Sequence, residues 1–191
     1  RGLFADGRIR LAAVAAKACA MIWVLSGPEC SGRTSLAKGL HEHRGWPLVP
    51  ELARCYLNER YAELGNHHYR PSDLLTLAAM QERIEAQLGS DTDAILDTDL
   101  LTLIVWWQDK YGPVPRPFAA KWQHLAPRRY LLCRPNMPWQ SDPQRENPVD
   151  RERLFARYET ELSRRQCLFT ICQGSEEARL QQALAAIQNL S

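Results

Sequence analysis

Eight consecutive residues, Gly27-Pro28-Glu29-Cys30-Ser31-Gly32-Arg33-Thr34, have the types and spacing suited to holding phosphate groups. Glycines five positions apart let successive backbone N–H groups turn toward an anion, and a helix starting there adds its positive end. The hydroxyl of Thr34 could ligate Mg²⁺, and the cation of Arg33 could reach the β- and γ-phosphates of ATP. Motifs of this kind normally have lysine at the position of Arg33, and arginine is not a conservative replacement there because it is bulkier and planar. We expect the following residues to bind ATP: Gly27, Pro28, Glu29, Cys30, Ser31, Gly32, Arg33, Thr34 and Ser35.

Acidic and basic residues elsewhere suggest the other parts of a phosphoryl-transfer site. Asp97 follows the apolar run 94–96 and could hold Mg²⁺ or accept a proton, or could simply cap the next helix. Asp99 could share this work and bind substrate, or be the cap itself. Glu51 is a candidate base or sugar ligand, with a first-turn helix acid as the alternative. Arg54, one turn later, could bind substrate or form a surface ion pair.

Three more side chains complete the predicted site. Arg145 lies in a proline-rich loop and could stabilise the charge of a transferring phosphoryl group, or remain a solvated charge. Trp106 and Trp139 could stack on the ring of a substrate, although aromatic residues at helical spacing are more often part of a core. We therefore expect Arg33, Glu51, Asp97 and Arg145 to be catalytic, and Thr34 and Asp97 to bind metal. Expected substrate-binding residues are Glu51, Arg54, Asp99, Trp106 and Trp139.

Alternating strands and helices are needed to bring these residues together. Short apolar runs predict strands, and amphipathic segments bounded by capping residues predict helices. Such alternation is typical of a parallel α/β sheet with helices on both faces. The three prolines at 113, 115 and 117 predict a stiff connection. The expected strands are 21–25, 47–50, 94–96, 130–133 and 167–171. One helix is expected to begin at 33, and the others are expected over 52–63, 72–88, 100–112, 150–165 and 175–190.

Length and composition exclude several other classes of protein. The 191 residues suit one domain, and 24 basic against 22 acidic residues provide no electrostatic case for nucleic acid or membrane partners. Six scattered cysteines fit neither a disulfide scaffold nor structural zinc, so we expect a cytoplasmic protein. The first Met is Met21, and we expect residues 1–20 to be a non-native or disordered extension, the alternative being a helix over 9–20. Residues 21–191 would then be one domain, with a lid at about 134–150 and an oligomeric state that the sequence leaves open.

Several segments, in order along most of the chain, resemble the ribosylnicotinamide kinase domain of NadR-type proteins. GPECSGRTSL over 27–36 is similar to the GPESSGKSTL loop of that family, and VPELARCYL over 49–57 is similar to its VPEyAReYL segment. The segment DTDLLT over 97–102, with Val105-Trp106 and Tyr111-Gly112 after it, resembles another family motif. Further similarity lies in Pro138-Trp139, Asp142, Arg145, Pro148 and 150–152, and in Gly174-Ser175, Glu177 and Arg179.

The resemblance implies a three-layer P-loop kinase fold whose five parallel strands are ordered 2-3-1-4-5. It also implies ATP and Mg²⁺ as cofactors, and transfer of the γ-phosphoryl group to the 5′-hydroxyl of nicotinamide riboside to give nicotinamide mononucleotide, a step of NAD biosynthesis. Arg33 departs from the family pattern, and so does Arg134-Pro135-Asn136, where the family often has acidic residues. A kinase of another nucleoside or nucleotide, and a nucleotide-binding sensor or pseudokinase impaired by Arg33, are the alternatives.

Overall fold

Five parallel strands form the centre of the molecule. The computed structural model describes residues 20–65, 68–140 and 149–189, so the expected extension lies outside the described residues apart from Ala20. The sheet has the order β2-β3-β1-β4-β5, which confirms the expected order and places β1 between β3 and β4. The strands are β1 (Ile22–Ser26), β2 (Leu48–Val49), β3 (Ala94–Asp97), β4 (Arg128–Cys133) and β5 (Phe169–Cys172).

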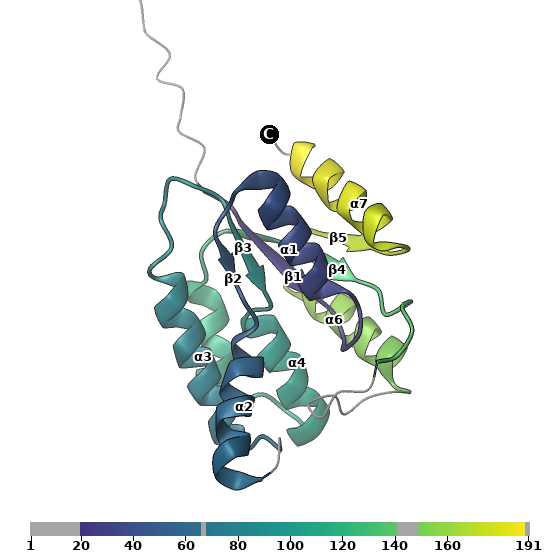
Figure 1. Cartoon of the computed structure of the whole chain (residues 1–191). Coiled ribbons are helices and arrows are strands. Elements are labelled where there is room, and N and C mark those ends of the chain that lie inside the picture. Colours follow the sequence, from purple (N-terminus) through teal and green to yellow (C-terminus); the bar gives the residue numbers. More distant parts are fainter. Residues whose placement is uncertain (1–19, 66–67, 141–148, 190–191) are drawn as a thin grey trace, which may run out of the picture.

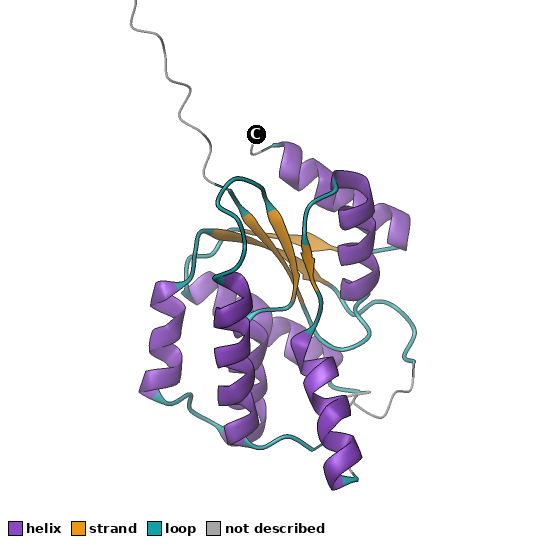
Figure 2. Cartoon of the chain, turned by 60° about the vertical axis from the view of Figure 1, so that its left-hand side comes forward, coloured by secondary structure: helices purple, strands orange, loops and turns teal. Residues whose placement is uncertain are grey.

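Helices cover both faces of this sheet (Figures 1 and 2). Successive side chains of β1 alternate between the two cores, as strand geometry requires. Trp23 and Leu25 pack with α1 (Arg33–Arg44) and α7 (Glu176–Gln188). Ile22 and Val24 pack with α4 (Leu100–Tyr111) and α6 (Arg151–Arg164). The side chains of β1 are almost fully buried, which explains why the strand is a continuous apolar run.

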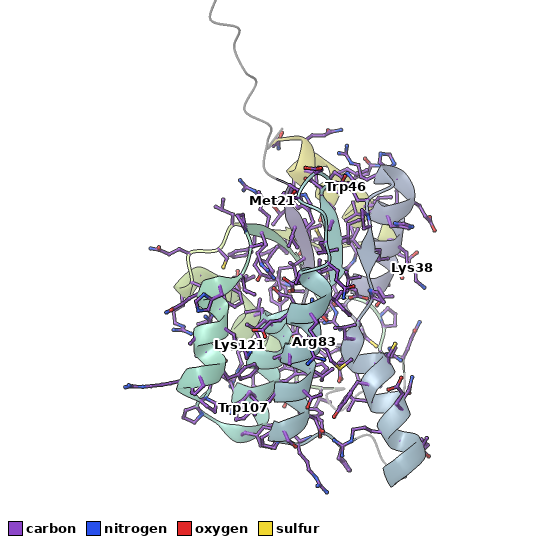
Figure 3. The ribbon with its side chains drawn as sticks, turned by 90° about the vertical axis from the view of Figure 1, so that its left-hand side faces the viewer. Met21, Lys38, Trp46, Arg83, Trp107 and Lys121 are labelled. Carbon is purple, nitrogen blue, oxygen red and sulfur yellow. The ribbon has the colours of Figure 1, made fainter. Side chains whose placement is uncertain are left out.

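A third core lies beside the sheet, among the helices that follow β2 and β3. It joins α2 (Leu52–Leu64), α3 (Pro71–Glu85), α4 and α5 (Arg116–Ala120), and Phe118 and Trp107 pack together in it with ring centroids 5.4 Å apart. The 3₁₀ helix η1 (Lys121–His124) follows α5 directly. Lys121, on η1, and Lys38, on α1, lie on opposite sides of the sheet (Figure 3). This third core fixes the position of α2 relative to α4, and therefore one side of the site described below.

Two helices differ from the predicted elements. The connection expected to be stiff contains α5, because Pro117 lies in the first turn, where a missing N–H costs nothing. Helix α3 begins at Pro71, one residue before the expected start at 72, and ends at Glu85 rather than at 88. Arg70 is its N-cap residue, and Asp73, in the first turn, accepts a 2.6 Å bond at Oδ2 from the N–H of Arg70. None of the helices in the described ranges is both long and apolar enough to cross a membrane.

Candidate active site

The predicted phosphate-binding loop connects β1 to α1. Gly27 has a φ of +141°, and a Cβ atom there would lie 2.5 Å from the carbonyl oxygen of Cys133 on the neighbouring strand. Gly32 is the N-cap residue of α1 and adopts a left-handed conformation with φ of +76°. Both positions therefore require glycine, because a side chain would collide or be strained. The loop follows a buried strand and opens a helix, which is the context that the motif predicts.

Thr34 and Asp97 meet at the carboxyl end of the sheet. The hydroxyl of Thr34, in the first turn of α1, donates a 2.6 Å hydrogen bond to Oδ2 of Asp97, at the end of β3. Oδ1 of Asp97 is buried and has no hydrogen-bond partner. A carboxylate oxygen without a hydrogen-bond partner, next to a hydroxyl group, is suited to binding Mg²⁺. Mg²⁺ prefers hard oxygen ligands, and the protein usually provides only a few of them. The part of the chain that the structure describes has no cluster of three or more His, Cys, Asp or Glu that could hold a metal ion, so phosphate oxygens and water would complete such a shell.

Arg33 extends across the site toward two carboxylates. Its Nη2 lies 3.5 Å from Oε1 of Glu51, and the residue is 8% exposed. Burial lowers the pKa of Arg33, but the charges of Glu51 and Asp97 outweigh that effect and raise it. Burial raises the pKa of Tyr158 to about 12, against the opposing charge of Arg33. Arg33 therefore keeps its positive charge. Its ion pair with Glu51 is longer than a strong charge-assisted hydrogen bond, so a phosphate oxygen could replace Glu51 as its partner.

A cleft of about 240 Å³ lies between the loop and α2. Its walls bring together most of the residues that the sequence predicts to act on substrates. Gly27, Pro28, Asp97, Asp99 and Trp139 are not among the lining residues, although Asp97 reaches the cleft through its bond to Thr34. The lining includes Glu29, Cys30, Ser31, Gly32, Arg33, Thr34, Ser35, Glu51, Arg54, Leu57, Trp106 and Met137.

The second wall of the cleft comes from α2 and α4. Glu51 is the residue before α2, and Arg54 lies in the first turn of that helix. Trp106 is half-buried on α4, where it stacks on Tyr69 with ring centroids 5.4 Å apart and an interplanar angle of 23°. One ring therefore supports the other while Trp106 faces the cleft, an arrangement suited to stacking against a planar ligand. Trp139 lies instead beneath Arg151, whose guanidinium carbon is 5.7 Å from its ring centroid.

Asp99 lies in a buried network outside the cleft, even though it is only two residues from Asp97. Its Oδ1 accepts the N–H of Leu101 at 2.9 Å and so caps α4, which is the alternative that the sequence left open. Its Oδ2 accepts bonds from Arg128 at 2.9 Å and from the Tyr130 hydroxyl at 2.7 Å. Between the two acids, Thr98 adopts a left-handed conformation with φ of +77°, so the chain turns sharply there. We therefore assign Asp99 to positioning α4 rather than to binding substrate.

Asp99→Ala is expected to lower the free energy of unfolding by about 3–5 kcal/mol, because it leaves the buried guanidinium of Arg128 without this partner and removes a helix cap. Urea denaturation followed by circular dichroism measures the change. The matched control is Glu82→Ala, which breaks the exposed ion pair between Glu82 and Lys121 and should cost less than about 1 kcal/mol. Equal costs for the two variants would contradict the assignment.

Arg145 lies outside the described residues, as does the middle of the expected lid, 141–148. Two arginines whose contacts the sequence did not predict touch the phosphate loop instead. Arg179 Nη1 donates to the carbonyl of Ser31 at 2.6 Å, and Arg151 Nη1 donates to the carbonyl of Cys30 at 3.4 Å. A signal for Arg179 existed in the sequence: it lies four and eight residues before Ala183 and Ile187, on the buried face of α7, where arginine is unusual.

Comparison with known proteins supports the architecture. The family described as AAA domain matches the sequence over residues 22–179. Deoxyadenosine kinase from M. mycoides superposes with a TM-score of 0.64 at 12% identity, over 90% of this chain and 100% of that kinase. The NadR protein in complex with NR gives 0.67 at 14% identity, over 89% of this chain and 51% of the NadR chain. Thymidylate kinase from Candida albicans gives 0.61 at 12% identity, over 90% and 92% of the two chains.

These likenesses, at such low identity, establish the fold. It is the expected P-loop kinase fold, with a five-stranded parallel sheet and helices on both faces. This chain spans about half the length of the NadR protein. No curated protein matches the sequence.

Proposed function

We propose that this chain, which belongs to the AAA domain family, is an ATP-dependent kinase of a small nucleoside. The acceptor we propose is the 5′-hydroxyl of nicotinamide riboside, and the product is nicotinamide mononucleotide. The observation that carries the proposal is the cleft itself, where the phosphate loop faces a second wall built from Glu51, Arg54 and Trp106. A cleft with a phosphate cradle on one side and an aromatic ring with charged groups on the other suits two ligands, a nucleotide and a nucleoside. The sequence resemblance over 49–57 and 97–106 supports nicotinamide riboside as the nucleoside.

The roles of the residues follow from their places in the cleft. The N–H groups of the loop and Arg33 would hold the β- and γ-phosphates, while Thr34 and Asp97 would hold Mg²⁺, which when bound neutralises charge on the phosphates. Glu51 would orient the acceptor hydroxyl and take its proton as the oxygen attacks the γ-phosphorus. The bond between the γ-phosphorus and the bridging oxygen then breaks, and ADP leaves. Arg54 would bind the substrate, and Trp106 would stack on its pyridinium ring.

The direct test is a kinase assay with purified protein, MgATP and a panel of acceptors. Nicotinamide riboside, deoxyadenosine, thymidine and thymidine monophosphate are each supplied, and ADP and the phosphorylated product are quantified. We expect nicotinamide riboside to have the highest kcat/KM. Preference for another acceptor would overturn the choice of substrate and leave a nucleoside or nucleotide kinase.

The second candidate function is a nucleotide-binding sensor, and Arg33 is the observation that favours it. Arginine in place of lysine keeps the charge but not the reach or shape of the side chain, so nucleotide could bind without transfer. Tight MgATP binding in calorimetry, with no product from any acceptor, would support this function and overturn the kinase.

Trp106→Ala is expected to raise KM for nicotinamide riboside by about 10- to 100-fold, because base–aromatic stacking contributes about 1–3 kcal/mol. KM for ATP should stay within about twofold, since Trp106 lies on the wall opposite the loop. Trp46→Ala is the control, because Trp46 is also half-buried but packs beside the core between the sheet and α1. Steady-state kinetics with each substrate varied in turn measures both constants. An equal change in both would contradict the stacking role.

A further inference from the structure

Arg179 is the most deeply buried cation in the described part of the chain, at 1% exposure. Its guanidinium has five N–H groups, and the structure provides five oxygen acceptors for them. These acceptors come from three segments that lie far apart in the sequence: the phosphate loop, the end of β4 and the end of β5. They are the carbonyls of Gly174 at 3.0 Å, Ser31 at 2.6 Å, Cys172 at 3.2 Å and Arg134 at 2.8 Å, and the side-chain oxygen of Asn136.

All five acceptors are neutral. Among the described residues, no carboxylate forms an ion pair with Arg179 at 4.0 Å or less, although several other arginines have such a partner. A buried charge without a counter-ion is costly, so structures rarely retain one without a partner. Its field already reaches the neighbouring thiols: burial raises the pKa of Cys172 to about 12, and Arg179 opposes that rise. A negatively charged ligand above the loop would supply the missing counter-charge.

The bond to Ser31 also sets the direction of a peptide group. Because the peptide between Ser31 and Gly32 is trans and planar, its C=O and N–H point in opposite directions. With the carbonyl of Ser31 held by Arg179, the N–H of Gly32 points away from the guanidinium. Arg151 holds the carbonyl of Cys30 in the same way, at 3.4 Å, and so directs the N–H of Ser31. Ser31 and Gly32 both line the cleft, where inward N–H groups would bind phosphate.

The same two arginines attach the segment after β4 to the loop. Arg179 bonds Arg134 and Asn136 of that segment, and Arg151 donates to the carbonyl of Met137 at 2.8 Å. A Cβ atom on Gly32 would lie 2.7 Å from Sδ of Met137, so the loop and this segment are in close contact. The phosphate loop and residues 134–137 therefore form one unit joined by two guanidinium groups.

We propose that Arg179, assisted by Arg151, is a positioning residue that holds the loop with the N–H groups of Ser31 and Gly32 directed at a bound polyphosphate. The proposal deepens the proposed function and rests on it for the nature of the ligand, a nucleotide polyphosphate. Neither arginine needs to touch the ligand. Each acts through the backbone carbonyl that it holds, and the positive charge of Arg179 balances the charge of the polyphosphate.

The test measures binding of MgATP, magnesium tripolyphosphate and nicotinamide riboside by calorimetry to the wild-type chain and to Arg179→Lys. Lysine keeps the charge but has three donors for five acceptors, so charge alone cannot restore the geometry. We expect affinity for MgATP and for tripolyphosphate to fall by about 10- to 100-fold, the loss of one or two charge-assisted hydrogen bonds. Affinity for nicotinamide riboside should stay within about twofold, a discrimination that a general loss of structure would not produce.

Two further variants keep the test decisive if Arg179→Lys does not fold, as judged by circular dichroism. Arg151→Gln removes the second guanidinium, which is only half-buried, and should weaken tripolyphosphate binding in the same direction. Arg153→Gln is the control, because Arg153 is exposed on the same helix, pairs with Asp109 and Asp150, and should leave binding unchanged. Amide NMR signals of Ser31 and Gly32 should shift in Arg151→Gln and stay in place in Arg153→Gln.

The outcomes separate this inference from the proposed function. Unchanged tripolyphosphate binding in the folded arginine variants would overturn the inference alone. Wild-type protein that binds polyphosphate but phosphorylates no acceptor would overturn the kinase, while a loss of that binding in the variants would still support Arg179. Wild-type protein that binds no polyphosphate would overturn both.

Discussion

Asp97→Asn is expected to lower kcat for phosphoryl transfer by about 10³-fold, the size of effect that loss of several kcal/mol of metal-based charge stabilisation produces. Asparagine keeps the shape of the side chain and an oxygen to accept the hydroxyl of Thr34, a bond of 2.6 Å in the wild-type chain. It removes the negative charge of Asp97. The buried oxygen that would ligate Mg²⁺, Oδ1, which has no hydrogen-bond partner in the wild-type chain, is then no longer part of a carboxylate. Initial rates at saturating MgATP and acceptor measure the loss, and a magnesium titration should show a weaker apparent affinity for the metal.

The matched control is Asp93→Asn, at the other end of the same strand. Asp93 accepts hydrogen bonds from the N–H of Met21 and from the indole of Trp23, at 2.9 and 3.3 Å, and so only supports the sheet. We expect kcat of this variant to stay within about twofold of wild type, with a loss of thermal stability. If Asp97→Asn kept its rate within tenfold of wild type, Asp97 would not be a metal ligand.

Arg33→Gln is expected to lower kcat by about 10²- to 10³-fold, whereas Arg33→Lys should remain within about tenfold of wild type. Glutamine removes a buried cation that faces both Glu51 and Asp97, so the transferring charge loses this stabilisation and the two acids repel each other. Lysine restores a positive charge at the position where phosphate loops normally have it. Single-turnover rates with bound ATP isolate the chemical step from binding.

Lys38→Gln serves as the control for Arg33, because it removes an exposed cation from the same helix. Its rate should equal that of wild type. A rise of more than tenfold in Arg33→Lys would mean that arginine impairs the native loop, and would favour the nucleotide sensor. Full activity in Arg33→Gln would contradict any role of this cation in transfer.

Local sequence patterns were sufficient to predict most of the fold. The apolar run that forms β1 has both faces buried, and Gly27 and Gly32 lie where a side chain would collide or be strained, so these signals are local. Ser175 caps α7 through a 3.2 Å bond from the N–H of Ala178, as its position before two acids predicts. The order of the strands came from the family resemblance, because no local pattern encodes which strands are neighbours.

The site was predictable only in part, because side-chain direction depends on the tertiary structure. Asp97 and Asp99 are two residues apart, and by sequence each could either act in the site or cap the helix that follows, with Asp97 the expected metal ligand. Thr98, with its positive φ, turns the chain so that Asp97 meets Thr34 while Asp99 meets Arg128 and Tyr130. A left-handed threonine is sterically unfavourable, so no sequence rule places one there.

By itself, then, the sequence determined the alternating elements, the phosphate loop and the two acids at the strand end, since these depend on residues close together in the chain. Only the tertiary structure decided which acid reaches the loop, that Trp106 rests on Tyr69 at the cleft, and that Arg179 binds the carbonyl of Ser31. Arg179 and Ser31 are 148 residues apart. Contacts of that separation form only when β1 and β5 are in one sheet, on either side of β4, and α7 packs beside α1.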